Sequence, residues 1–499
     1  MFPVMLASRT FDKADQVSFA CLSGDFNPIH MDPLAARRTN ASSTVVHGVH
    51  AVLWALDKLV ELGSLTGRVA SLDVQFIKFV FVGDRVELRL LKSDHISIRA
   101  ELALDDLVAT TLVLGIGSRR KKREDMIDVG LDRIATKQPA DILRLEELEK
   151  RSGWIDSLAS PEQIEQQFRY AAAEIGAERL TAIALLSPLV GMICPGLHSL
   201  FAAFSVELLD DSETRHGIGF RVKETDERFR MVRINVFGSG VSGSVQAFLR
   251  WPPVTQASVD EIARLVAPIE FAGSTALIIG GSRGLGSLTA KIIAAGGGNV
   301  IITYATGQDD ALKLAQEINT RFANNACKTI QYDAREELSS QLEGLGAPVS
   351  HLYYFATPQI ARQKKRLFVS GLLDEFVQVY VKAFYDCCHF LSEHGSRSLT
   401  AYYPSSVFVE THPTGMAEYS MAKMAGEILC SYINRAHGRI HVIMDRLPRL
   451  LTDQTATLPP VKSADPLEIM LPIIRKVQSA QASPKTARSG STLAWNSRP

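Results

Sequence analysis

The chain has 499 residues, of which 46% are hydrophobic and 22% charged, and its 54 basic and 54 acidic side chains cancel. This length exceeds one hydrophobic core and predicts about three domains. The zero net charge argues against nucleic acid as a partner. The sequence contains no run of about 18 apolar residues, so it predicts no membrane span. Six scattered cysteines without Cys-x-x-Cys spacing indicate free thiols, with neither disulfides nor a metal site, so we expect a cytoplasmic protein.

Residues 1–118 combine a helical stretch after Gly48 with strand-like runs. Their most informative segment is Ser-Gly-Asp-Phe-Asn-Pro-Ile-His-Met-Asp at residues 23–32, which places Asp25 and His30 around Asn-Pro. Proline interrupts a helix and allows a compact turn, so the carboxylate and the imidazole can be aimed at one water. Such a pair suits the addition of water to an activated double bond, or its removal. A turn capped by Asp25, with His30 at the surface, explains the same residues without catalysis.

Residues 119–255 repeat the order of helix followed by strands in a weaker form, which predicts an internal duplication. The basic run at residues 119–123 is interpreted as a solvated linker, because acidic residues follow it at once. This block has no counterpart of the Asp-x4-His segment, so we expect it to be non-catalytic. Cys194 and His198 are its candidates for chemistry, with structural roles as the alternative.

After a linker at residues 256–271, the pattern of residues 272–499 becomes βαβ and predicts a doubly wound parallel sheet. Its first strand leads into Gly-Gly-Ser-Arg-Gly-Leu-Gly at residues 280–286 and then into a helix. Such a turn lets the backbone approach a pyrophosphate at the N-terminus of a helix. The candidate cofactor contacts in this turn are Gly280, Ser282, Arg283, Gly284 and Gly286.

The second βαβ strand is predicted at residues 299–306, and no carboxylate stands at its tip, which includes Tyr304. An acidic residue there would bind the adenosine ribose; without it a 2′-phosphate is not repelled, and Arg283 can pair with that phosphate. The sequence therefore favours NADP(H) over NAD as the cofactor. A surface arginine is the alternative interpretation of Arg283.

Tyr419 and Lys423 lie one helical turn apart, on one face of a predicted helix. A cation in that position lowers the pKa of the phenol and equips it to exchange a proton with a carbonyl group. Ser406 precedes Tyr419 at the end of a predicted strand, where its hydroxyl can orient the same carbonyl.

With these motifs, residues 272–499 resemble the short-chain dehydrogenase/reductases, and specifically the NADP-dependent 3-oxoacyl reductases. The catalytic serine, tyrosine and lysine of that family are matched by Ser406, Tyr419 and Lys423. In the family the tyrosine and the lysine also contact the cofactor, which implies the same role for Tyr419 and Lys423. The resemblance implies further cofactor contacts at Tyr304, Asp333 and Ala356, and an ordered last strand at residues 489–496.

The chain departs from this family around the catalytic trio. Ile279 stands in place of the loop threonine, and the segment Asn-Ala-Gly reads Phe-Ala-Thr at residues 355–357. The relay asparagine is replaced near Tyr380, and Arg449 stands in place of the glycine of Pro-Gly. These departures indicate reduced activity or an unusual substrate.

Residues 7–118 resemble the MaoC-like (R)-specific enoyl-CoA hydratases of the hot-dog fold, through residues 23–32, 45–48 and 79–84. In that family the Asp/His pair, here Asp25 and His30, holds the catalytic water. The backbone N–H of the glycine that matches Gly48 polarises the thioester carbonyl.

The middle block resembles the second repeat of a double-hot-dog dehydratase, whose role is to complete the sheet and the acyl tunnel. We therefore expect an α+β double hot-dog followed by an α/β Rossmann-type domain. A supporting serine of the hydratase family is replaced at Leu56, and His50 is expected to be a core or interface residue.

Together the two resemblances predict a bifunctional (R)-3-hydroxyacyl-thioester dehydratase and NADPH-dependent 3-oxoacyl-thioester reductase. Its partners would be acyl-CoA or acyl-carrier-protein thioesters and a second copy of the chain in a homodimer. Two alternatives remain: an oxidative hydratase/3-hydroxyacyl dehydrogenase, or a dehydratase whose degenerate reductase domain is a scaffold.

Overall fold

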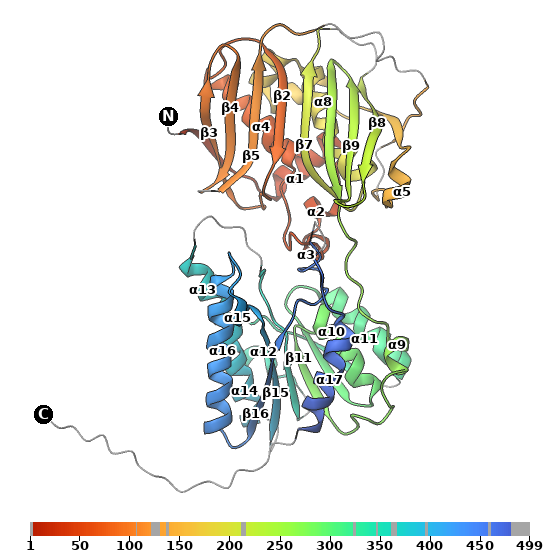
Figure 1. Ribbon diagram of the computed structural model, residues 1–499, viewed down its shortest axis with the longest axis vertical. Coiled ribbons are helices and arrows are strands. Elements are labelled where there is room, and N and C mark those ends of the chain that lie inside the picture. The colour runs from red at the N-terminus through yellow and green to blue at the C-terminus, as the bar shows by residue number, and fades with distance from the viewer. Residues whose placement is uncertain are drawn as a thin grey trace, which may run out of the picture. The chain divides into compact units, whose positions relative to one another are not determined.

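The computed structural model describes residues 3–105, 107–120, 130–135, 139–210, 216–322, 326–345, 348–360, 367–394, 398–457 and 461–480. The chain forms two compact units (Figure 1), the first built mainly on Met1–Pro253 and the second mainly on Val254–Arg362 and Arg366–Thr455.

The first unit contains a ten-stranded antiparallel sheet in the order β1-β3-β4-β5-β2-β7-β10-β9-β8-β6. The first five strands, in chain order, are β1 (Val4–Thr10), β2 (Val69–Phe76), β3 (Arg85–Ser93), β4 (Ser97–Leu104) and β5 (Leu107–Ile116). The next five are β6 (Ser152–Asp156), β7 (Ser199–Leu208), β8 (Gly217–Asp226), β9 (Met231–Gly238) and β10 (Val241–Leu249). Each half has the same internal order, and the halves join where β2 pairs with β7, so the predicted duplication is confirmed.

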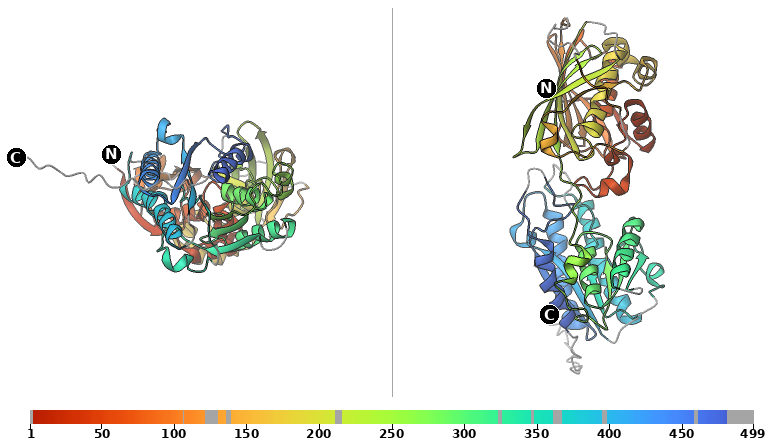
Figure 2. Two further views of the ribbon diagram at one scale, coloured as in Figure 1. Left: turned by 90° about the horizontal axis from the view of Figure 1, so that it is seen from below. Right: turned by 90° about the vertical axis from the view of Figure 1, so that its right-hand side faces the viewer.

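Each repeat contributes one long helix to the same face of this sheet (Figures 1 and 2): α4 (Gly48–Glu61) and α8 (Ala177–Pro188), which continues as the π-helical turn η2 (Leu189–Ile193). The two helices contact each other, and most of their own side chains are buried. Shorter helices complete the layer: α1 (Lys13–Ser23), α2 (Pro28–Met31), α3 (Pro33–Arg37), α5 (Leu145–Leu148), α6 (Pro161–Gln167) and α7 (Arg169–Ile175). This is the expected double hot-dog.

Within the described ranges no single helix combines the length and the apolarity that crossing a membrane requires. The helices Arg169–Ile175 and Ala177–Ile193, which are bent by 112° at the break between them, reach the required length and composition only when taken together.

The second unit is a six-stranded parallel sheet in the order β13-β12-β11-β14-β15-β16. Its strands are β11 (Thr275–Ile279), β12 (Asn299–Tyr304), β13 (Cys327–Gln331), β14 (His351–Tyr354), β15 (Leu399–Ser406) and β16 (Ile440–Leu447). One core contains residues of α10 (Gly284–Ala295), α11 (Gln308–Phe322) and α17 (Pro466–Ser479). The other contains residues of α12 (Ser339–Leu342), α13 (Ser370–Val377), the π-helical turn η3 (Gln378–Lys382), α14 (Ala383–His394) and α16 (Ala417–Ala436). The short α15 (Phe408–Thr411) follows β15. Helices thus cover both faces, as expected of a doubly wound sheet.

Two segments that were expected to be linkers are partly folded. In residues 256–271, α9 (Val259–Ala263) packs on α10, and Val259, Ile262 and Phe271 are buried in the core of the second unit. In the basic run, Arg119 is buried and donates to the carbonyl oxygens of Val69 and Glu174, so this arginine is not solvated. Residues 121–123 and the expected strand at 489–496 lie outside the described residues.

His50 is a core residue, as the sequence predicts. It is fully buried on α4, stacks on Phe19 with 4.8 Å between ring centroids, and meets the rings of Phe11 and Phe168 edge-on. Among the described residues neither ring nitrogen has a hydrogen-bond partner. Burial, together with the nearby Arg9 cation, lowers the pKa of His50 to about 3.

This environment makes the first unit sensitive to acid. An unfolded histidine has a pKa of about 6.5, so between pH 6.5 and 3 the unfolded state binds the extra proton. The contribution of neutral His50 to stability is complete above pH 6.5 and is lost as the pH falls toward 3, by at most about 1.4 kcal/mol per pH unit. We expect His50→Leu to raise the Tm at neutral pH and to flatten the fall of Tm with acid. Melting curves from pH 7 to 4 test this, with exposed His95→Leu as the control; an unchanged slope in His50→Leu would contradict it.

Candidate active sites

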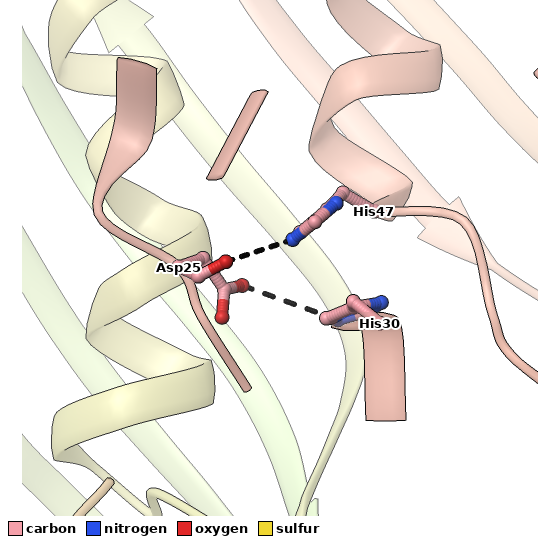
Figure 3. Close-up of side chains that lie close together, drawn as sticks. All are labelled: Asp25, His30 and His47. Carbon is pink, nitrogen blue, oxygen red and sulfur yellow. Dashed lines mark hydrogen bonds and ion pairs between the residues drawn. The ribbon is translucent and has the colours of Figure 1, made fainter. Parts of the chain in front are cut away.

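Asp25 and His30 lie side by side because the chain turns sharply between them. Helix α1 ends at Ser23 and is capped by Gly24, which has a left-handed φ of 88°, and Asp25 follows in the interior with 1% exposure. Asn27 then caps α2, with Pro28 as its first residue, and α2 carries His30. The carboxylate Oδ2 of Asp25 lies 4.0 Å from Nε2 of His30 (Figure 3). The structure thus brings together the two residues that the sequence singles out.

The orientation of His30 determines which of its nitrogens is free for chemistry. Its Nδ1 lies 2.8 Å from the carbonyl oxygen of Val45. A carbonyl oxygen can only accept, so Nδ1 carries the proton and Nε2 is directed toward Asp25. Nε2 is therefore the atom that can take up and release a proton beside the carboxylate.

The second repeat contributes directly to this site. Ser187, near the end of α8, donates to Oδ2 of Asp25 over 2.6 Å, and the backbone N–H of Asn27 donates to Oδ1 over 3.1 Å. Burial raises the pKa of Asp25, whereas His30, Ser187 and Asn27 act in the opposite direction. The prediction from the sequence missed Ser187, although it is a hydroxyl in an apolar run. It supplies from the second repeat the kind of support expected at Leu56, which is instead buried in the core.

Close backbone packing makes room for that contact. At Gly191 a Cβ atom would lie 2.5 Å from Oδ1 of Asp25. The side-chain amide of Asn27 donates to the carbonyl oxygen of Gly191 over 2.6 Å. Cys194, three residues further on, is fully buried, and burial raises the pKa of its thiol to about 12, so a structural role fits it best.

His47 completes a cluster with Asp25 and His30 whose ligand atoms lie within 4.8 Å of one another, close enough for a metal ion by distance alone. However, its Nδ1 lies 2.8 Å from Oε1 of Gln16 and its Nε2 2.9 Å from the carbonyl oxygen of Asp25. Both nitrogens face protein oxygens, which leaves this ring no nitrogen for an ion. The imidazole instead stacks on that of His30, with 4.1 Å between centroids.

Gly48 begins α4 directly beside the pair. His47 occupies the N-cap position of this helix, but its side chain forms no hydrogen bond to the first N–H groups of α4. These N–H groups lie at the positive end of the helix dipole. At Gly48 a Cβ atom would lie 2.7 Å from the ring of Phe76. One pocket is lined by Asp25, His30, Gly48 and Ser187. Its volume is about 710 Å³ including the solvent at its opening, and its other lining residues are largely apolar.

In the second unit the glycine-rich turn connects β11 to α10. Gly280 and Gly284 have left-handed φ values of 73° and 57°. A Cβ atom at Gly286 would lie 2.3 Å from the carbonyl oxygen of Gly280, so a side chain there is excluded. Arg283 caps α10 without a side-chain hydrogen bond to the helix, leaving that N-terminus without a side-chain cap. These features suit a close approach of phosphate oxygens to the backbone.

Other expected cofactor contacts are engaged with neighbours. Arg283 pairs with Asp453 over 3.3 Å, and Asp333 accepts two hydrogen bonds from the guanidinium of Arg335. Tyr304 ends β12 and is partly buried, and Ala356 lines a pocket after β14.

Ser406 ends β15, and Tyr419 and Lys423 share one face of α16, so the predicted trio is assembled. All three line a second pocket of about 1030 Å³, counted to its open mouth. Burial raises the pKa of Tyr419 to about 12, against a hydrogen bond with Ser406 that lowers it. The expectation that Lys423 lowers the pKa of Tyr419 is therefore wrong: burial dominates, and the opposing effect comes from Ser406. Burial also lowers the pKa of Lys423 to about 7, and its ammonium donates to the carbonyl oxygen of Pro404 over 2.7 Å.

The departures from the reductase pattern surround this trio. Tyr380 lies in η3, and its ring faces the ammonium of Lys423 with 4.0 Å to the centroid. Its hydroxyl lies 2.5 Å from that of Thr357. Arg449 lines the same pocket and donates to the carbonyl oxygen of Thr455.

Comparison with known proteins agrees with this architecture. Residues 3–111 match the family model of the MaoC like domain, and residues 274–448 match that of the short chain dehydrogenases. The (R)-specific enoyl-CoA hydratase of Aeromonas caviae is 36% identical over 94 residues, which are 17% of this chain and 69% of that protein. The chain belongs to the MaoC-like hydratase family. Its second unit adds a short-chain dehydrogenase domain.

The other similarities are more limited. The peroxisomal hydratase-dehydrogenase-epimerase of Saccharomyces cerevisiae is 32% identical over 82 residues, 16% of this chain and 9% of that protein. The chain spans 25%, 4% and 9% of the length of three curated relatives that it matches. A solved Serratia marcescens short-chain dehydrogenase/reductase covers 43% of this MaoC-like chain and 94% of its own, with 22% identity and a TM-score of 0.38.

Ser187 offers a direct test of the contribution from the second repeat. Removing its hydroxyl removes a hydrogen bond to a buried carboxylate, a contact worth about 1.5–3 kcal/mol, and raises the pKa of Asp25. We expect Ser187→Ala to slow hydration of crotonyl-CoA about tenfold or more and to move the acidic limb of its pH profile upward by about one unit. Thr181→Ala, a buried hydroxyl on α8 bonded to Ala177, should leave the profile unchanged. An identical profile in Ser187→Ala would contradict the assignment.

Proposed function

We propose that the chain is a bifunctional enzyme of acyl-thioester metabolism. The first unit interconverts (R)-3-hydroxyacyl and trans-2-enoyl thioesters, and the second reduces 3-oxoacyl thioesters with NADPH, the acyl group being carried by CoA or an acyl-carrier protein. The observation that carries the proposal is the Asp25–His30 pair beside the start of α4 in a largely apolar pocket. The product of the reduction is the substrate of the dehydration, which makes the fusion chemically coherent.

In the hydratase pocket the pair would hold one water against C3 of the enoyl chain. As the water oxygen bonds to C3, one of its protons passes to the Asp25–His30 pair, and a proton from the pair is delivered to C2; dehydration is the reverse. The Gly48 N–H, at the positive end of α4, would donate to the thioester oxygen as negative charge develops there. Ser187 would hold Asp25 in place, and its hydrogen bond opposes the rise in the pKa of Asp25 that burial causes.

The second unit fits a nicotinamide cofactor on structural grounds: its glycine turn excludes side chains and leads into a helix without a side-chain cap. When bound, NADPH supplies a hydride. Tyr419 would donate a proton to the substrate carbonyl oxygen, Ser406 would hold that oxygen, and Lys423 would hold the cofactor ribose and the relay of protons to Tyr419. The lack of a carboxylate after Tyr304 supports NADPH over NADH.

The protonation state of Tyr419 is the one that proton donation to a substrate carbonyl requires. A phenol with its pKa raised to about 12 is protonated at neutral pH and is ready to donate. The oxidative alternative needs the phenolate as a base, which burial makes costly. The other alternative, in which the second unit is a scaffold without catalysis, predicts that this unit binds no NADPH.

Separate loss of the two activities tests the assignment. We expect Asp25→Asn to reduce hydration of crotonyl-CoA by about a thousandfold or more while NADPH-dependent reduction of acetoacetyl-CoA persists, because the two sites share no residue. Tyr419→Phe should do the opposite. Enoyl absorbance and NADPH absorbance follow the two reactions. Undiminished hydration in Asp25→Asn would refute the hydratase site, and undiminished reduction in Tyr419→Phe would refute the reductase site.

Arg283 tests the choice of cofactor. If its guanidinium pairs with a 2′-phosphate, Arg283→Ala should weaken NADPH binding about tenfold or more and leave NADH binding nearly unchanged. Fluorescence titration of the full chain with both nucleotides measures this. Equal losses for the two nucleotides would show that Arg283 does not read the 2′-phosphate.

A further inference from the structure

The segment after β16 forms a compact turn along one wall of the pocket in the second unit. Arg449, Thr452, Gln454 and Thr455 all line that pocket. Internal hydrogen bonds tie the turn together: the hydroxyl of Thr455 donates to the carbonyl oxygen of Leu450 over 2.5 Å, and the N–H of Thr452 donates to that hydroxyl over 2.8 Å. These internal hydrogen bonds hold the segment 450–455 in one folded conformation.

Two side chains of this turn reach across to other walls. Asp453 pairs through Oδ2 with Arg283 in the glycine-rich turn over 3.3 Å, and its Oδ1 accepts from the N–H of Val254 over 2.8 Å. Gln454 accepts from the N–H of Ile360, in the segment after β14, over 3.1 Å. The turn is thus fastened on both sides of the pocket, and Asp453 fastens it to the glycine-rich turn.

This ion pair conflicts with the binding of a phosphate at Arg283. A phosphate there and the carboxylate of Asp453 would need the same guanidinium, and two anions in contact repel. The side chains of Arg283 and Asp453 are only 28% and 14% exposed, so solvent screens this competition weakly.

We propose that Asp453 is a latch: it closes the turn 450–455 against the glycine-rich turn and competes with the cofactor phosphate for Arg283. NADPH must displace this carboxylate in order to bind, so Asp453 weakens NADPH binding and holds the turn closed in its absence. Asp453 acts through Arg283 and is a positioning residue. The inference rests on the proposed function of the second unit.

The substitution Asp453→Asn isolates this role, since the amide oxygen can still accept from Val254 while the competing charge is lost. We expect NADPH to bind about five- to tenfold more tightly to Asp453→Asn than to the wild type, with a smaller change for NADH, in fluorescence titrations of the full chain. Asp260→Asn is the matched control, because Asp260 forms an ion pair with Arg321 outside the pocket. Unchanged or weaker NADPH binding in Asp453→Asn would overturn the latch.

A second measurement without cofactor separates the latch from the proposed function. Amide hydrogen exchange in residues 450–455 should be faster in Asp453→Asn than in the wild type, and equal exchange would overturn the latch. A wild-type chain that binds neither nucleotide would refute the proposed reductase, while the exchange measurement would still decide whether Asp453 fastens the turn.

Discussion

The carboxylate of Asp25 lies in the interior of the first unit, with 1% of the residue exposed. Removing a carboxylate from water costs several kcal/mol unless charges and hydrogen bonds compensate. Here the compensation comes from both repeats: the N–H of Asn27 and the imidazole of His30 from the first, and the hydroxyl of Ser187 from the second. The pairing of β2 with β7 and the contact of α4 with α8 hold those groups in place. The duplicated sheet is therefore a condition for the chemistry of the site as well as for the fold.

The second unit uses burial differently. Its phenol and ammonium are placed where neither is well solvated, which keeps Tyr419 protonated and lowers the pKa of Lys423 to about 7. The aromatic face of Tyr380 lies against that ammonium in a cation–π contact, near the position where the resemblance to the reductases implies an asparagine. The trio of Ser406, Tyr419 and Lys423 is assembled in one pocket, and the departures from the reductase pattern at Thr357, Tyr380 and Arg449 line the same pocket.

Much of this arrangement follows from local patterns. The Asn-Pro step between Asp25 and His30 starts a new helix, because proline is compatible with a first helical turn and not with a helix interior. The alternation of apolar strands and helices predicted the parallel sheet, and the four-residue spacing of Tyr419 and Lys423 placed both on one face of α16. These features depend on residues that are close in the chain, and so they can be derived from the sequence.

The sequence by itself determined the parallel sheet, the Asp25–His30 pair, the glycine-rich turn and the trio of Ser406, Tyr419 and Lys423 through short-range patterns, and the hot-dog fold through its resemblance to the MaoC-like hydratases. Only the tertiary structure decided that Ser187 supports Asp25 and that Asp453 pairs with Arg283, across separations of 162 and 170 residues. It also decided the protonation state of Tyr419, which depends on how completely distant segments exclude water. Hydrogen bonds, ion pairs and desolvation act through space, and no local pattern specifies which remote side chain will complete them.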